Sequence, residues 1–114
     1  MQLIFDNEDA VNLLIEQGAE IDAQDMSGNT ALMGVCFKGN IGLAELLISK
    51  GANVNIQNAT GMTPLMFAAS YNQIEAVKLL LANSSDINLK DANGYTALDI
   101  ASQKGFKDII NLLS

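Results

Sequence analysis

The sequence predicts an all-α solenoid of stacked helix-turn-helix units with projecting loops or hairpins. The block NATGMTPLMFAA from Asn58 recurs 33 residues earlier as DMSGNTALMGVC from Asp25, and 33 residues later as DANGYTALDIAS from Asp91. A second apolar segment with helical spacing follows each copy. A fixed period of this length is typical of repeat proteins, whose units bury their apolar faces against neighbouring units.

We expect one domain over residues 1–114. The length suits a single compact unit, and 49% of the residues are hydrophobic, which is enough for a continuous core. The spacing predicts three full or nearly full repeats and a truncated N-terminal one, with units of about 1–24, 25–57, 58–90 and 91–114.

The truncated first unit begins with the tail of a short helix over residues 1–5. A second helix is predicted over residues 8–17, because Val11 and Leu14 share one face. Gly18 then ends this helix, as a glycine in the left-handed conformation commonly does.

The first helix of each later unit follows a threonine, whose hydroxyl can accept a hydrogen bond from an early backbone N–H. Pro64 strengthens one of these starts, because its missing N–H is harmless at the first helical position. These helices are expected from Thr30 to about Lys38, from Thr63, and from Thr96 to about Gln103.

The second helices return antiparallel to the first. Asn72 replaces the glycine of the turn in the third unit, and asparagine tolerates left-handed φ better than most residues. In the same unit Asn83 or Ser84 must replace the terminal glycine, at a cost of about 1 kcal/mol. The second helices are predicted over 41–49, 74–82 and 107–113.

Three sequence segments at this spacing resemble the ankyrin repeat family: GMTPLMFAA at Gly61, SKGANVN at Ser49 and EQGAEID at Glu16. The resemblance covers nearly the whole chain. It implies that each unit is a helix-turn-helix followed by a loop or hairpin projecting roughly at right angles, and that the units stack into a curved solenoid.

One position departs from the family, which often has a histidine two residues after the proline. The matching residues here are Met33, Met66 and Asp99. The two methionines favour apolar packing in the core over a cofactor contact. Asp99 can still bond Thr96.

The composition argues against an enzyme and against cofactor or metal sites. The chain has no histidine or arginine and a single cysteine, which removes most metal sites and most pairs of nucleophile and base. Cys36 occupies the position of Ala69 and Ser102 in later units, so we expect a small buried residue. We expect no catalytic residues, no cofactor and no metal.

The net charge of −7 is concentrated at one end. Residues 1–37 hold seven carboxylates and no lysine, whereas the remainder holds six of each. This distribution can steer a basic partner, or it can simply keep the surface solvated. Lysines that are not clustered argue against nucleic acid binding. No apolar run reaches membrane-spanning length and no signal peptide is evident, so we expect a cytoplasmic protein that does not contact membranes.

The resemblance implies that a protein partner meets the concave side, which the loop tips and the exposed faces of the first helices form. An aromatic stripe there would bury a large area at low entropy cost. In the alternative, Phe37 and Tyr71 pack against the next repeat as partial core. The positions carried over are Met26, Asn29, Phe37, Lys38, Met62, Ser70, Tyr71, Tyr95, Gln103 and Lys104.

The predicted function is a non-catalytic protein–protein interaction module that uses this concave groove. The alternative is an inhibitor or immunity-type protein that blocks an enzyme through its acidic N-terminal end. In a third hypothesis, Asn55 and Asn88 are substrates of an asparaginyl hydroxylase. The alternative is that both asparagines have a structural role in the loops. The apolar residues Ile109, Ile110, Leu112 and Leu113 near a free edge indicate either a longer array or end-to-end self-association.

Overall fold

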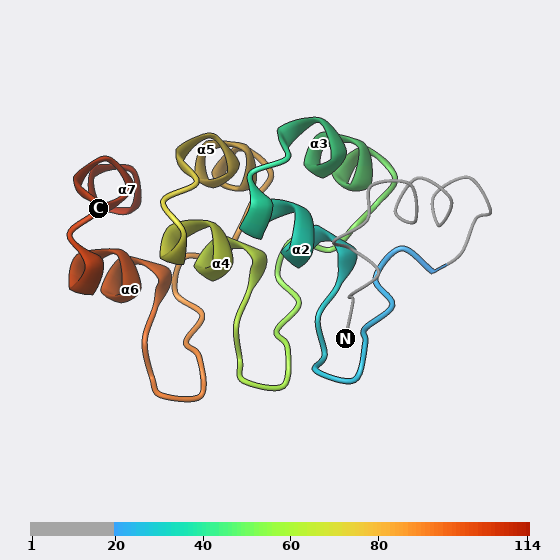
Figure 1. Cartoon of the computed structure of the whole chain (residues 1–114), viewed down its shortest axis with the longest axis horizontal. Helices are drawn as coiled ribbons and strands as arrows, with labels where there is room; N and C mark the ends of the chain where they lie inside the picture. Colours follow the sequence, from blue (N-terminus) through green and yellow to red (C-terminus); the bar gives the residue numbers. More distant parts are fainter. Residues whose placement is uncertain (1–19) are drawn as a thin grey trace.

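The computed structural model describes residues 20–114, which form six helices in two rows (Figure 1). Helices α2, α4 and α6 lie side by side in one row, and α3, α5 and α7 form the other. Long loops project from the first row, away from the second. The helices are α2 (Ala31–Lys38), α3 (Ile41–Ser49), α4 (Pro64–Ser70), α5 (Ile74–Ala82), α6 (Ala97–Lys104) and α7 (Lys107–Leu113).

Each repeat packs on its neighbours through both rows. Helix α4 contacts α2 and α6, and α5 contacts α3 and α7. Leu47, Leu80 and Leu113 occupy the same position in three successive repeats, and all three are buried. One continuous core therefore runs through the stack. The predicted all-α solenoid is confirmed, and the described residues contain no strand.

The first helices begin as the sequence predicts. Thr30 Oγ1 accepts a hydrogen bond from Met33 N at 3.3 Å, and Thr30 N donates to Met33 Sδ at 3.4 Å. In α6, Asp99 replaces the methionine, and its Oδ2 accepts from Thr96 N at 3.0 Å. Met33 and Met66 are each 1% exposed, so both belong to the core. Helix α6 ends at Lys104, one residue later than expected.

Two residues other than glycine adopt left-handed φ in the described part of the chain. They are Asn72, with φ of 56°, and Ser84, with φ of 70°. Asn83 keeps φ of −114°, so Ser84 is the residue that replaces the missing glycine after α5. This conformation lets Ser85 N reach Leu80 O at 3.1 Å, which satisfies one of the free carbonyls at the helix end.

Hydrogen bonds between successive loops hold the loop tips in register. Ala59 N donates to Ser27 O at 3.0 Å, and Ala92 N donates to Thr60 O at 2.9 Å. These donors lie one period apart, as do the acceptors. The first two of these three loops are therefore each held by the loop of the next repeat.

Two glutamines strengthen this connection. Gln57 Nε2 donates to Gly61 O in its own loop and to Lys90 O in the next, at 3.0 and 2.9 Å. Gln24 makes the equivalent pair of bonds to Gly28 O and Gln57 O. The sequence-based interpretation missed both glutamines, although their 33-residue spacing was a visible signal.

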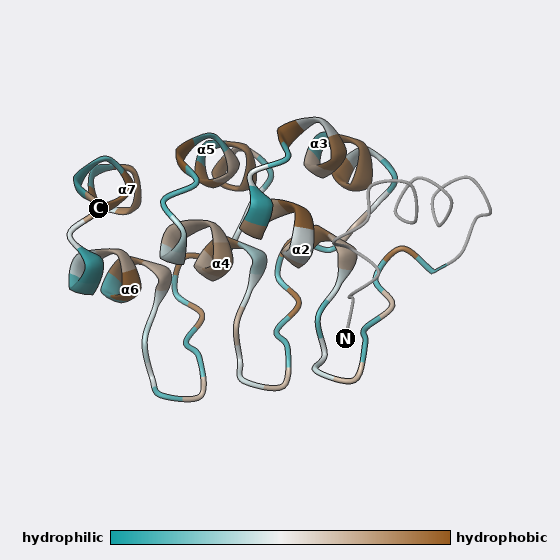
Figure 2. Cartoon of the chain, in the orientation of Figure 1, coloured by the Kyte–Doolittle hydropathy of each residue, from teal (hydrophilic) through white to brown (hydrophobic). Residues whose placement is uncertain are grey.

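The outer face of the last repeat is more polar than the apolar edge that we expected. Asp99 and Ser102 are exposed, whereas the matching positions in inner repeats are buried. Figure 2 shows correspondingly more hydrophilic residues on α6 and α7 than on α3. Ile109 and Leu113 are 0% and 4% exposed, because they pack into the core. The expected apolar edge is wrong for these two residues, and Ile110 and Leu112 are half-buried.

Candidate partner-binding face

Three side chains from three successive repeats meet at the C-terminal ends of the first helices. The rings of Phe37 and Tyr71 pack edge to face, with centroids 4.4 Å apart and planes at 85°. Lys104 Nζ lies 5.9 Å from the centroid of the Tyr71 ring. This distance is within the range of a cation–π contact. We call Phe37, Tyr71 and Lys104 the aromatic–lysine row.

Helix ends and a glutamine position this row. Helix α2 closes at Gly39, and α4 closes at Tyr71 itself. Gln73 Nε2 donates to Phe37 O at 3.0 Å, which ties the turn after α4 to the end of α2. A side chain at Gly39 would collide with the Gln73 amide, so the glycine leaves the room for this contact. No distinct sequence signal pointed to Gln73, because its partner is a backbone carbonyl in another repeat.

The large exposed apolar side chains of the described residues fall mostly on the predicted face. They are Met26, Tyr71, Tyr95 and Ile87, and the first three are among the predicted partner-binding positions. Met26 is 93% exposed and Tyr71 is 53% exposed. Ile87 lies outside the predicted set, in the segment that follows α5.

The other predicted positions divide into exposed and half-buried residues. Asn29 is half-buried, and its Oδ1 accepts from Asn58 Nδ2 at 2.7 Å. Met62 is also half-buried and packs against the core. These two residues therefore also stabilise the stack. Lys38, Gln103 and Lys104 are exposed, and Ser70 is half-buried.

For Phe37 the sequence left two roles open: a place in the exposed aromatic stripe, or packing against the next repeat as partial core. Phe37 combines the two. Its side chain is half-buried, and it packs on a residue of the next repeat. Tyr71 is instead exposed over half of its surface. Phe37 thus supports the ring of Tyr71, which faces solvent.

The loop residues of the face are held by a side-chain carboxylate. Asp91 Oδ1 accepts from Asn93 N at 2.9 Å and from Tyr95 N at 3.0 Å. Asp25 Oδ1 makes the same two bonds in its own loop, to Ser27 N and Asn29 N. These bonds mimic backbone turns and fix the loop backbone next to Met26 and Tyr95.

The single cysteine of the chain lies within the described residues. Cys36 is completely buried, and burial raises the pKa of its thiol to about 12. The thiol therefore stays protonated near neutral pH. Residues 20–114 contain no group of three or more histidine, cysteine, aspartate or glutamate side chains that could hold a metal ion. Within the same range, none of the helices could span a membrane.

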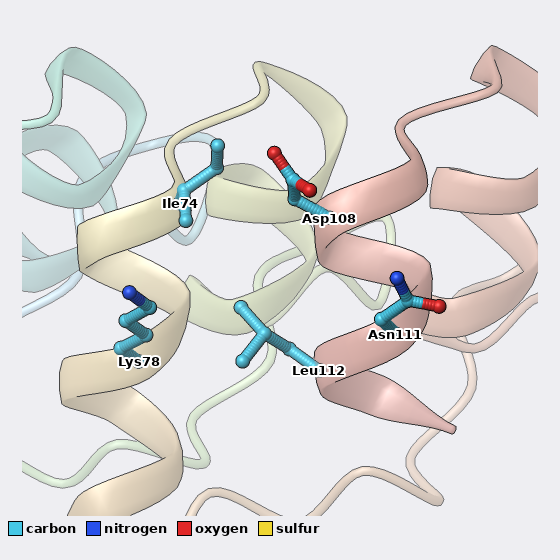
Figure 3. A pocket seen from close by; sticks show the side chains of 5 residues that line it. All are labelled: Ile74, Lys78, Asp108, Asn111 and Leu112. Carbon is cyan, nitrogen blue, oxygen red and sulfur yellow. The ribbon is translucent and has the colours of Figure 1, made fainter.

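A hollow of about 310 Å³ lies between α5 and α7, in the other row of helices. Figure 3 shows its five lining residues: Ile74 and Lys78 on α5, and Asp108, Asn111 and Leu112 on α7, with the side chains of Asp108 and Leu112 directed toward α5. A second hollow of about 210 Å³ lies one repeat earlier, between α3 and α5. Because the hollow recurs with the repeat, we attribute it to the packing of adjacent helices.

The comparisons with known proteins agree with this architecture. The family model described as "Ankyrin repeats (3 copies)" matches residues 1–91 and 53–114. No curated protein matches the chain. The two family matches together cover the whole sequence, and the described repeats have two helices and a projecting loop. The chain therefore belongs to the ankyrin repeat family.

Proposed function

We propose that this protein is a non-catalytic interaction module that binds a protein partner on the concave side, across the first helices and the loop tips. Ankyrin repeats generally serve as protein–protein interaction modules. The observation that carries the proposal for this chain is the placement of Met26, Tyr71 and Tyr95, three of the four large apolar side chains that residues 20–114 expose.

Exposed aromatic side chains are common anchors of protein interfaces, because they bury a large area with few rotatable bonds. Tyr71 is held from one side by Phe37, so little of its freedom remains to be lost on binding. Tyr95 follows a turn fixed by Asp91. The face is therefore partly pre-organised for a partner.

The test is capture of partners from the native source by immobilised wild-type chain and by the double variant Phe37→Ala, Tyr71→Ala. We expect the double variant to lose the proteins that the wild type retains. Ile87→Ala is the matched control, because it truncates an exposed apolar residue outside the face. Unchanged capture by a folded double variant would contradict the assignment of the groove.

The alternative function, inhibition of an enzyme through the acidic end, depends on the seven carboxylates of residues 1–37. Three of them, Glu20, Asp22 and Asp25, belong to the described residues, and the other four lie outside them. It predicts a complex with a basic partner whose affinity falls steeply with salt. A complex that salt does not weaken would argue against it.

The polar surface of the last repeat argues against end-to-end association of two copies of the chain through that repeat. The exposed Asp99 and Ser102 stand where an adjoining repeat would need apolar residues. Light scattering on a size-exclusion column measures this directly, and we expect no association through the α6 face.

A further inference from the structure

We infer that the aromatic–lysine row recognises a carboxylate-bearing peptide segment, in which an acidic residue lies next to an apolar or aromatic one. The inference rests on the proposed function, since it assigns the chemistry of the partner to the same face. It differs from the expectation of a basic partner, which came from the overall charge of the chain.

Lys104 carries a positive charge that no carboxylate of the described residues neutralises. Its Nζ contacts the ring of Tyr71, and it forms no ion pair within residues 20–114. A cation–π contact orients an ammonium group but leaves its net charge and its N–H donors available. By contrast, Lys78 on α5 is paired with Glu75 at 3.5 Å. The ring thus positions a cation next to an apolar anchor.

The first row of helices is poor in competing negative charge. Helices α2, α4 and α6 contain a single carboxylate, Asp99, and it accepts a hydrogen bond from Thr96 N in the first turn of α6. The second row carries Glu45, Glu75 and Asp108. An anionic group therefore meets less repulsion along the first row than along the second.

The end of α6 itself does not cancel the charge of Lys104. Its last carbonyls attract cations, but two of them already accept backbone bonds. Gly105 N donates to Ser102 O at 3.2 Å, and Phe106 N donates to Ala101 O at 3.1 Å. The side chains of Ser70 and Gln103 add neutral polar groups at matching positions of adjacent helices. A carboxylate can bind Lys104 while its apolar neighbour covers Tyr71.

The experiment selects peptides from a random phage-displayed library on the immobilised full-length chain. Selected sequences are synthesised with a fluorophore, and their Kd is measured by anisotropy against four proteins. These are the wild type, Lys104→Glu, Tyr71→Ala, and Lys50→Glu as the matched control. Lys50 is an exposed lysine at the end of α3, so its reversal changes the net charge equally but leaves the face intact. Circular dichroism checks that each variant is folded.

We expect acidic residues beside apolar ones to be enriched. Lys104→Glu should weaken these peptides about tenfold, because it removes one attraction and adds one repulsion at an exposed site. Lys50→Glu should change the Kd by less than about twofold, since Lys50 ends α3, in the other row of helices, and the charge of an exposed side chain is screened by salt.

Three results would overturn the inference: enrichment of basic peptides, enrichment of none, or acidic peptides that are insensitive to Lys104→Glu. If the selected peptides are basic, or acidic but insensitive to Lys104→Glu, and Tyr71→Ala still abolishes their binding, the proposed concave binding face is retained. Only the inferred preference for a carboxylate is then wrong. If Tyr71→Ala leaves every selected peptide bound, the proposed binding face fails as well.

Discussion

The backbone N–H of Ala92 occupies the space that a side chain on Gly61 would need. A Cβ atom on Gly61 would lie 2.8 Å from Ala92 N, which is closer than a Cβ atom approaches a backbone nitrogen in real proteins. Gly61 also has φ of 78°. Its lack of a side chain therefore serves two purposes: the turn of its own loop and the close approach of the next loop.

This relationship predicts different costs for the same substitution in two loops. Gly94 matches Gly61, with φ of 85°, but nothing lies within 4 Å of its Cβ position. Gly94→Ala should therefore lower the free energy of unfolding by about 1 kcal/mol, from left-handed strain alone. Gly61→Ala should cost about 1–3 kcal/mol more, because the loops must separate. Urea unfolding followed by circular dichroism measures both, and equal costs would show that loop packing contributes nothing.

Asn55 and Asn88 should likewise differ in their effect on stability. Asn55 Oδ1 accepts from Asp86 N at 2.7 Å, and its Nδ2 donates to Ser84 O at 3.4 Å. The side chain of Asn88 makes no hydrogen bond to the described residues. Asn55→Ala should cost about 0.5–1.5 kcal/mol of unfolding free energy, since it removes the hydrogen bonds that join the Asn55 side chain to the next repeat.

Asn88→Ala serves as the control and should cost less than about 0.5 kcal/mol. A large loss from Asn88→Ala would contradict this contrast. Hydroxylation of Asn55 and Asn88 is a separate prediction. Mass spectrometry of protein from the native source would test it.

The polar outer face of α6 should prevent self-association. Asp99 and Ser102 match Met66 and Ala69, which are 1% and 0% exposed beneath the next repeat. The double variant Asp99→Met, Ser102→Ala should therefore associate with rising concentration, because burying a methionine contributes about 1.5–3 kcal/mol. Light scattering compares it with the wild type. A variant that stays monomeric at high concentration would show that these two residues do not control association.

Cys36 should make stability depend on pH in the alkaline range. Burial raises the pKa of its thiol from 9.0 to about 12, so the folded state resists ionisation. The neutral thiol stabilises the fold fully below pH 9, and this contribution is lost as the pH rises toward 12. The slope should be about 1.4 kcal/mol per pH unit within that window.

Cys36→Ala isolates this effect, because the matching residue of the next repeat is Ala69. The difference in unfolding free energy between wild type and Cys36→Ala should shrink steadily between pH 9 and about 12. Other titrating groups are common to both proteins and cancel. A constant difference would contradict the raised pKa.

Local signals in the sequence were sufficient to predict where the helices lie. Threonine caps, Pro64 and the helical spacing of apolar residues predicted where the helices lie, because these features act within a few residues. Asn72 was correctly expected to be left-handed, and Ser84 was one of two candidates after α5. The period then placed the same positions of successive repeats side by side.

The contacts between repeats were less accessible from the sequence. The edge-to-face contact joins Phe37 to Tyr71, which differ by one position within their repeats, so the period alone does not bring them together. The burial of Ile109 depended on which side of α7 faces α5, and apolarity does not specify that side. The placement of Lys104 over a ring likewise depends on the rotation between adjacent repeats.

The aromatic–lysine row draws one side chain from each of three repeats, so it exists only while the three are stacked. If α6 and α7 fray, Lys104 leaves the ring of Tyr71 although α2–α5 can remain folded. A ligand that touches all three side chains would clamp the terminal repeat in place. Hydrogen exchange at the amides of α7, remote from the ligand, would then slow on binding and report occupancy of the face.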